Sequence, residues 1–143
     1  TDRIKDLIIT SGGKNIAPQA VEMAIGKDHF IEQIAVIGDQ KPYVGALVVP
    51  TFPVLEEWAG REGLEWSDHA DLVAKPEVEA LYRDRIDGQS HELAHFEQVK
   101  RFRLLTEAFT QEAGEITPTL KLRRKQIVER RRADIDALYD QST

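Results

Sequence analysis

Apolar runs separated by turn-forming residues dominate this chain. Residues 31–38 and 43–50 are apolar at nearly every position and are joined by the turn sequence Asp-Gln-Lys-Pro, which predicts two strands. Because the apolar residues follow one another without alternation, we expect both faces of the sheet to be covered. Residues 100–105 alternate between polar and apolar side chains and predict a further strand, followed by a loop at 107–120.

Apolar side chains at three- and four-residue spacing predict helices beside these strands. Residues 52–63 form one such helix, with an apolar side made of Val54, Leu55 and Trp58. A longer helix begins at Pro76, and its apolar stripe consists of Val78, Leu81, Tyr82, Ile86, Leu93 and Phe96. The last helix runs from about residue 123 to residue 139, and its inward side chains are Ile127, Val128, Ile135 and Leu138.

The N-terminal residues predict a β-hairpin. Residues 6–10 are short and apolar, Ser-Gly-Gly forms a tight turn, and residues 15–17 return as the second strand. Pro18 then fits the first turn of a helix. The glycine pair has two interpretations at this point, a turn that needs positive φ or a close backbone approach to a ligand. A nucleotide P-loop is not expected, because the required glycine and Ser/Thr positions hold Ile8 and Asn15.

These elements together predict an α+β fold, a small mixed β-sheet flanked by helices with an N-terminal β-hairpin. The 143 residues suit one domain, and 41% hydrophobic with 31% charged residues is typical of a soluble globular protein. The chain has no cysteine, which excludes disulfides and thiolate chemistry and fits the reducing cytoplasm. No apolar run is long enough to span a bilayer. The chain begins inside an apparent motif, so we expect a piece of a larger protein.

Charge is unevenly distributed along the chain. A net charge of −6 argues against nucleic-acid binding by the domain as a whole. Residues 121–132, however, hold seven basic residues against one acid. This segment is interpreted first as the solvated face of a terminal helix, and second as a local anion site that leaves open a peripheral contact with an anionic membrane.

The sequence His-Glu-Leu-Ala-His at residues 91–95 matches the HExxH pattern of zinc proteases. On a helix, His91 and His95 would lie one turn apart and could face one metal ion, with Glu92 as a base. Leu93 belongs to the predicted core stripe, which a metal cleft would disturb. No third ligand stands out among the downstream loop carboxylates, Glu107, Glu112 and Glu115. We therefore expect no metal site here and interpret both histidines as partly exposed helix residues.

Two stretches, taken together, resemble known motifs. Residues 2–22, DRIKDLIITSGGKNIAPQAVE, resemble the motif that opens the C-terminal domain of AMP-forming acyl-CoA synthetases and their adenylating relatives. Residues 114–125, GEITPTLKLRRK, resemble the closing motif of that domain, whose lysine is catalytic. The lysine here follows Thr-Pro-Thr-Leu instead of Ser-Gly, which is similar to the long-chain fatty acyl-CoA synthetase branch. The resemblance covers essentially the whole chain and implies that residues 1–143 are one C-terminal lid domain.

The resemblance implies a two-step ligase. A fatty acid and MgATP give acyl-adenylate and pyrophosphate, and coenzyme A then displaces AMP to give the thioester. The lid rotates between the two steps and presents a different element in each. The resemblance also implies that ATP, Mg²⁺ and the acyl chain are bound mainly by a large N-terminal domain, which is absent from this chain and would be its partner. We expect the isolated chain to be inactive as a ligase.

Carried over by position, the resemblance assigns five residues. Lys121 corresponds to the catalytic lysine of adenylation, and Lys5 occupies the hinge position. Arg3 would lie near the ribose and phosphates of the nucleotide. Gly12 and Gly13 would form the wall of the tunnel for the pantetheine arm of coenzyme A. An ammonium on a long stem can bridge a carboxylate and an α-phosphate and relieve their repulsion, which is the chemistry that adenylation requires.

The remaining residues of both motifs are interpreted as structural. Pro18 and Glu22 match the opening motif and are taken as fold residues, although the acid expected two positions after Pro18 is Ala20 here. The basic residues that follow the lysine are taken as helix surface, in reach of coenzyme A phosphates or an anionic membrane: Arg123, Arg124 and Lys125.

Three alternatives remain. The first is an adenylating enzyme for another acid or acceptor, such as an acyl-AMP ligase that charges a carrier protein. The second is a non-enzymatic module that binds nucleic acid or an anionic membrane through the basic last helix, which a salt-dependent affinity would reveal. The third is the zinc protease. The chain length of the acyl group is not encoded in these residues, because the acyl pocket belongs to the N-terminal domain.

Overall fold

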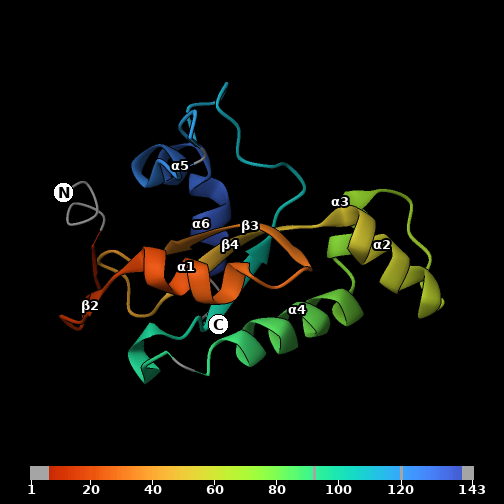
Figure 1. The fold of residues 1–143 in the computed structure, drawn as a ribbon, viewed down its shortest axis with the longest axis horizontal. Helices are drawn as coiled ribbons and strands as arrows, with labels where there is room; N and C mark the ends of the chain where they lie inside the picture. The colour runs from red at the N-terminus through yellow and green to blue at the C-terminus, as the bar shows by residue number, and fades with distance from the viewer. Residues whose placement is uncertain (1–6, 92, 120, 140–143) are drawn as a thin grey trace.

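A three-stranded mixed sheet lies at the centre of the computed structural model, which describes residues 7–91, 93–119 and 121–139 (Figure 1). The strand order is β3 (Ile31–Ile37), β4 (Gly45–Pro50) and β5 (Arg101–Leu104). β3 and β4 are antiparallel, whereas β4 and β5 are parallel. All three strands were predicted, and the parallel pair makes the sheet mixed, so the predicted fold class is confirmed.

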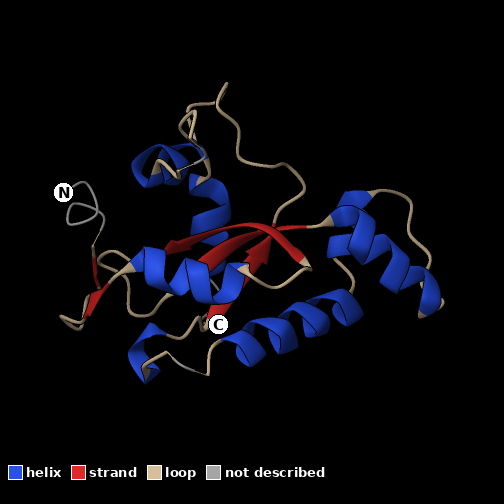
Figure 2. Cartoon of the chain, viewed as in Figure 1, coloured by secondary structure: helices blue, strands red, loops and turns tan. Residues whose placement is uncertain are grey.

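Helices cover both faces of this sheet, as the continuous apolar strands predicted. On one face, Val36, Ala46 and Val48 pack in a cluster with α1 (Pro18–Gly26) and α4 (Pro76–Gln89). On the other face, Ala35, Leu47 and Val49 pack with α5 (Arg124–Arg130) and α6 (Arg132–Tyr139). Figure 2 shows the strands enclosed between these two helical layers. Alternate strand residues thus enter two separate cores.

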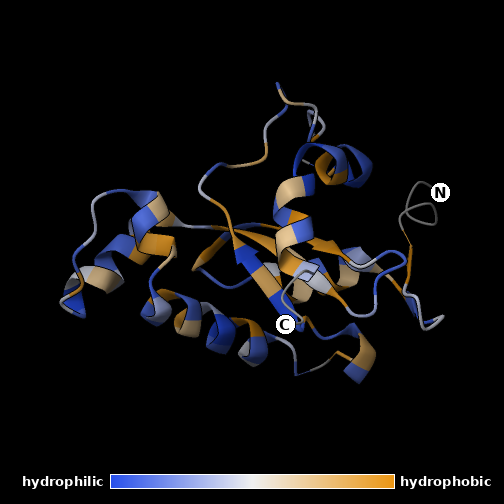
Figure 3. Cartoon of the chain, turned by 180° about the vertical axis from the view of Figure 1, so that it is seen from behind, coloured by the Kyte–Doolittle hydropathy of each residue, from blue (hydrophilic) through white to orange (hydrophobic). Residues whose placement is uncertain are grey.

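The connection from β4 to β5 crosses one face of the sheet, because parallel strands cannot be joined by a tight turn. It contains α2 (Phe52–Arg61), α3 (His69–Val73) and α4. In Figure 3, which is coloured by hydropathy, these helices carry alternating polar and apolar stretches. α3 was not predicted. It begins at Asp68, whose side chain accepts a hydrogen bond of 2.8 Å from the Asp71 N–H.

The N-terminal hairpin forms a separate two-stranded sheet, as predicted. β1 (Ile8–Ile9) pairs antiparallel with β2 (Asn15–Ile16). Ile8 and Ile16 face the core, whereas Ile9 is exposed. The turn after β3 supports the hairpin, since the Gln40 N–H donates to the Ile9 carbonyl at 2.8 Å and the Ser11 N–H donates to the Lys41 carbonyl at 2.9 Å.

Two predicted helices have different boundaries in the structure. α4 ends at Gln89, where the Ser90 hydroxyl donates to the Ile86 carbonyl at 2.6 Å and closes the last turn. Leu93 and Phe96 therefore do not extend the stripe of α4, and Phe96 is 41% exposed. The predicted last helix is two helices, because the backbone at Arg131 (φ −107°, ψ 26°) leaves helical geometry between α5 and α6.

A buried carboxylate fixes the end of α1 to α4. Asp28 accepts hydrogen bonds from the Phe30 N–H at 2.9 Å, from Arg85 Nε at 2.8 Å and from Gln89 Nε2 at 3.1 Å. Burial alone would raise the pKa of Asp28, but these three hydrogen bonds and the charge of Arg85 outweigh it and hold the pKa below the ordinary value of 3.8. Asp28 therefore stabilises the folded state in its ionised form.

We expect Asp28→Asn to lower the free energy of unfolding by about 2 kcal/mol at neutral pH, because the ionised partner of Arg85 is lost. Since the folded-state pKa is depressed, the wild-type advantage is present above about pH 5 and disappears as the pH falls below about 4. Urea unfolding of both proteins between pH 3 and pH 7 measures this. Asp84→Asn, at an exposed position of α4, is the control. A difference between wild type and Asp28→Asn that does not change with pH would contradict the assignment.

Candidate functional site

Lys121 lies on a loop that folds back on itself between β5 and α5. Ile116 and Leu122 form an isolated antiparallel bridge within this loop. Beyond the bridge, the Thr117 N–H donates to the Lys121 carbonyl at 2.8 Å, and the Lys121 N–H donates to Thr117 Oγ1 at 3.0 Å. The lysine is therefore held by its own backbone in a short hairpin-like turn.

The Lys121 side chain is exposed. Within the described ranges, no carboxylate forms an ion pair with its ammonium group. Nearby, the hydroxyl groups of Thr117 and Thr119 share a hydrogen bond of 3.0 Å. A fixed backbone with an unengaged ammonium can meet an anion that arrives from outside this domain.

The glycine pair lies at the exposed tip of the N-terminal hairpin. Gly13 has φ of +85°, so the turn itself requires a glycine there. Gly12 has no such requirement, and a Cβ at this position would meet only Thr10 Oγ1, at 4.0 Å. Turn geometry therefore accounts for Gly13 alone. The open surface at Gly12 is compatible with close approach of a ligand, and the tunnel role of both glycines stays a prediction.

The structure does not bring the predicted site residues together. The glycine hairpin lies at one side of the molecule, whereas the loop between β5 and α5 extends from the end where α5 lies (Figure 1). The view from behind shows the same separation (Figure 3). Arg3 and Lys5 lie outside the described residues, so their predicted roles stay predictions. The glycine hairpin and the loop of Lys121 therefore lie on different parts of the surface of the domain.

Arg124 was predicted to be a surface residue, and this prediction is wrong. Its side chain is 10% exposed and donates to Glu22 Oε2 at 2.6 Å and to the Val36 carbonyl at 2.8 Å. Glu22 Oε2 also accepts a hydrogen bond of 2.7 Å from the Val36 N–H. This junction joins α1, β3 and α5, so the interpretation of Glu22 as a fold residue agrees with its contacts.

Glu115 was interpreted as an ordinary loop carboxylate, and this is also wrong. Its side chain is 1% exposed and pairs with Arg131 Nε at 2.8 Å. Arg124 and Arg131 thus each neutralise a carboxylate inside the domain. Fewer basic side chains of residues 121–132 are therefore available to bind an external anion than the sequence suggested. No described helix is long and apolar enough to cross a membrane.

The HExxH sequence does not lie on a helix. Because α4 ends at Gln89, His91 falls in a turn and His95 begins a separate 3₁₀ helix, His95–Glu97. The expectation that these histidines lie one helical turn apart is therefore wrong. In the ranges that the structure describes, no three His, Cys, Asp or Glu side chains gather as metal ligands would.

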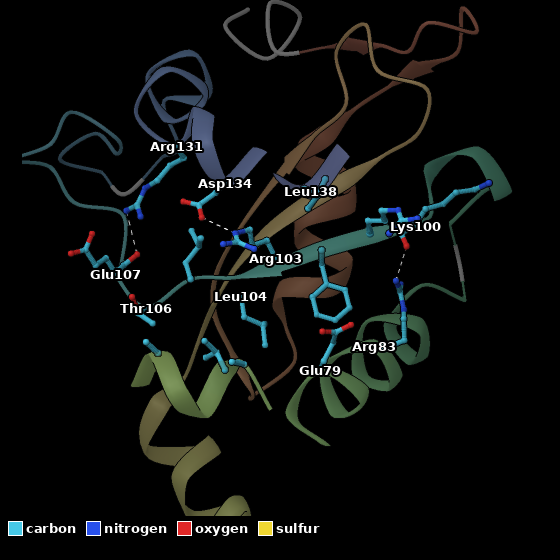
Figure 4. Close-up of a pocket in the computed structure, with 16 residues that line it drawn as sticks. Glu79, Arg83, Lys100, Arg103, Leu104, Thr106, Glu107, Arg131, Asp134 and Leu138 are labelled. Carbon is cyan, nitrogen blue, oxygen red and sulfur yellow. Dashed lines mark hydrogen bonds and ion pairs between the residues drawn. The ribbon is translucent and has the colours of Figure 1, made fainter. Parts of the chain in front are cut away.

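A polar groove of about 630 Å³ runs along β5 (Figure 4). Both signs of charge line it, and the guanidinium groups of Arg83, Arg103 and Arg131 already have partners within the domain. Arg103 Nε donates to Asp134 Oδ1 at 2.7 Å, and Arg83 donates to the carbonyl of Lys100 at 2.9 Å. With its guanidinium groups engaged in this way, the groove is a poor candidate for the binding of a phosphate.

In comparisons with known proteins, this fold is that of the adenylating domains of adenylate-forming enzymes. A family profile described as "AMP-binding enzyme C-terminal domain" matches residues 5–143, and the chain belongs to this family.

The chain is similar to several fatty-acid ligases. It is 35% identical over 141 residues to the long-chain-fatty-acid–CoA ligase FadD15 of Mycobacterium tuberculosis, which covers 98% of this chain and 24% of FadD15. It is 33% identical to long chain acyl-CoA synthetase 8 of Arabidopsis thaliana, over 96% of this chain and 20% of that protein. The chain therefore spans about a quarter or less of the length of these relatives.

Among solved structures, the chain resembles the A domain of carboxylic acid reductase from Segniliparus rugosus in complex with AMP and a co-purified carboxylic acid. The TM-score is 0.76 at 26% sequence identity. The match covers 99% of this chain and 21% of that chain.

We expect Arg124→Ala to lower the free energy of unfolding by about 3 kcal/mol, because it leaves the largely buried Glu22 carboxylate without its guanidinium partner. Chemical denaturation of the 143-residue chain measures this. Lys125→Ala, at the next and exposed position, is the matched control and should change the stability by less than about 0.5 kcal/mol. Equal, small effects of the two substitutions would show that the junction of Arg124 contributes little.

Proposed function

We propose that this chain is the C-terminal domain of an AMP-forming long-chain-fatty-acid–CoA ligase. The observation that carries the proposal is Lys121, an exposed lysine at the end of a backbone-braced loop, in a Thr-Pro-Thr-Leu-Lys motif. Membership of the family and the similarity to long-chain ligases support it. A large N-terminal domain then binds the fatty acid and ATP, and this chain acts together with it.

In the first half-reaction, a carboxylate oxygen of the fatty acid attacks the α-phosphorus of ATP, and pyrophosphate leaves. Two anions must approach each other, and Lys121 reduces their repulsion by placing its ammonium between them. Mg²⁺ would neutralise further phosphate charge. The described residues offer no cluster of ligands for it, so we assign its binding to the N-terminal domain.

In the second half-reaction, the thiol of coenzyme A attacks the acyl carbonyl carbon and AMP leaves. We propose that the domain has then rotated, so that the glycine hairpin meets the pantetheine arm where Lys121 stood before. The separation of the hairpin from the lysine loop supports this, because one orientation cannot present both (Figure 1). Lys5 is the proposed hinge, and Arg3 the proposed contact to the nucleotide.

A second candidate differs only in the acceptor. The structural similarity to the A domain of a carboxylic acid reductase, solved alone and as an A-PCP didomain, favours an enzyme that adenylates an acid and passes the acyl group to the thiol of a carrier protein. Lys121 has the same role in that reaction. Formation of acyl-CoA by the full-length protein, from fatty acid, ATP and free coenzyme A, distinguishes the two acceptors.

We expect Lys121→Ala in the full-length protein to slow adenylation on the order of 10²–10³-fold, since one preorganised charge contact is lost. Thioester formation from supplied acyl-adenylate should remain within about tenfold of wild type, because Lys121 has left the cleft in that pose. Lys121→Arg should not restore the full rate, since guanidinium is bulkier and differently hydrated. Separate assays of pyrophosphate release and acyl-CoA formation measure the two steps.

The control is Lys27→Ala, an exposed lysine at the C-terminal end of α1 and outside both motifs, which should leave both half-reactions close to wild type. Equal slowing of both half-reactions by Lys121→Ala would refute the two-pose assignment. If neither half-reaction slows, Lys121 is a solvated surface charge and the proposed function fails.

We expect Lys5→Pro in the full-length protein to impair the rotation. A hinge residue must change its backbone angles between the poses, and proline fixes φ near −65°. One half-reaction should therefore lose much more activity than the other, whichever pose is trapped. Lys5→Ala, which keeps φ free, is the control. Equal losses in both half-reactions for Lys5→Pro would argue against a hinge at this position.

A further inference from the structure

We propose that Glu115 and Arg131 are positioning residues that hold the loop of Lys121 in its catalytic orientation. The proposal rests on the proposed function of Lys121. It concerns a buried ion pair that the reaction scheme above does not use. Neither residue contacts a reacting atom in this proposal, since both act through the backbone of the loop.

Glu115 stands at the point where the loop of Lys121 leaves the domain and returns to it. Its N–H donates to the Thr110 carbonyl at 3.0 Å, and its own carbonyl accepts from the Arg123 N–H at 2.8 Å. Its Oε1 also accepts from the Thr110 N–H at 3.3 Å. Lys121 lies on the excursion between residues 115 and 123, so any movement of Glu115 moves the base of the lysine loop.

Arg131 fixes Glu115 to the helical layer. Its Nε donates to Glu115 Oε2 at 2.8 Å, and its Nη2 lies 3.4 Å from Oε1, so both nitrogens face the carboxylate. The same Nη2 lies within hydrogen-bonding distance of the carbonyls of Glu107 and Ala108, at 3.2 and 3.3 Å. One guanidinium group thus contacts both the residues that lead into the loop, Glu107 and Ala108, and the carboxylate of Glu115 at its base.

The helix break gives Arg131 this reach. It lies between α5 and α6, where the backbone leaves helical geometry, and its guanidinium lies 5.2 Å from the centre of the Phe109 ring. Phe109 is itself fixed to β3, since its N–H donates to Gln33 Oε1 at 2.7 Å and its carbonyl accepts from Gln33 Nε2 at 3.2 Å. The base of the lysine loop is therefore connected to the central sheet through Phe109 and Gln33.

A buried ion pair at this place indicates positioning more than stability. Desolvation largely cancels the attraction between two buried charges, so an apolar pair would stabilise the fold about as well. The ion pair instead sets a direction, because a carboxylate and a guanidinium meet in one plane. A misplacement of about 1 Å in a catalytic group can cost on the order of 10²-fold in rate, which makes such a brace consequential for Lys121.

The test uses Glu115→Gln in the full-length protein, since glutamine keeps the size of the side chain and removes its charge. We expect the kcat of adenylation to fall on the order of tenfold, with the KM for ATP within about twofold and thioester formation from supplied acyl-adenylate unchanged. Arg131→Lys should have the same pattern, because one ammonium cannot replace the planar fork that serves the carboxylate and two carbonyls. Circular dichroism verifies that each variant is folded.

Asp28→Asn is the matched control, because Asp28 is also a buried carboxylate paired with an arginine at 2.8 Å, but it joins α1 to α4 and does not touch the lysine loop. It should not slow adenylation selectively. The decisive measurement is Glu115→Gln combined with Lys121→Ala. If Glu115 acts through Lys121, the second substitution should add less than about twofold to the effect of Lys121→Ala alone.

The outcomes separate the two proposals. If Lys121→Ala slows adenylation but Glu115→Gln does not, the positioning role is refuted and the function of Lys121 stands. Equal slowing of both half-reactions by Glu115→Gln, or a full multiplicative effect in the Lys121→Ala background, would also refute it and leave only a structural ion pair. If Lys121→Ala itself leaves adenylation intact, both proposals fail.

Discussion

The junction of Arg124, Glu22 and Val36 is the interaction on which the rest of the structure depends. It joins the helix that follows the glycine hairpin, the edge strand β3, and the helix that follows the lysine loop. Replacement of such a pair by apolar residues often costs little stability, but loss of one partner leaves a buried charge uncompensated. The junction therefore fixes how the glycine hairpin and the lysine loop are oriented relative to the sheet. The proposed rotation of the domain requires such rigidity.

Much of the fold was predictable because it follows from local periodicity. The strands β3 and β4 are apolar at nearly every position, and the structure covers both their faces with helices. The N-terminal hairpin followed from its Gly-Gly turn. The ends of the helices were harder to predict, since α4 ends where the Ser90 hydroxyl caps it and the predicted last helix breaks at Arg131. An apolar stripe encodes neither the hydrogen bond of Ser90 nor the contacts of Arg131 with the loop before α5.

The candidate site was predictable in part, for a different reason. Lys121 was found from its motif, and the structure places it on a braced, exposed loop. Its supporting charges were missed, because Arg124 and Glu115 look like solvated residues in a polar segment. The partner of Arg124 is 102 positions away in sequence, and that of Glu115, Arg131, lies at the break of a helix that was expected to be continuous. Burial of a charge is a property of the assembled fold, and local sequence carries almost no signal of it.

The parallel pairing of β4 with β5 also constrains the order in which the domain can assemble. β3 and β4 are neighbours along the chain, whereas β5 pairs with β4 only after residues 51–100 have been enclosed as a loop. Closing that longer loop costs roughly 1.5 kcal/mol more in chain entropy than closing the turn between β3 and β4. On a ribosome, one edge of β4 stays unpaired until β5 emerges, and Lys121 emerges later still. Synthesis thus completes the three strands of the sheet before Lys121 emerges, whereas α5 and α6, which cover one face of that sheet, follow it.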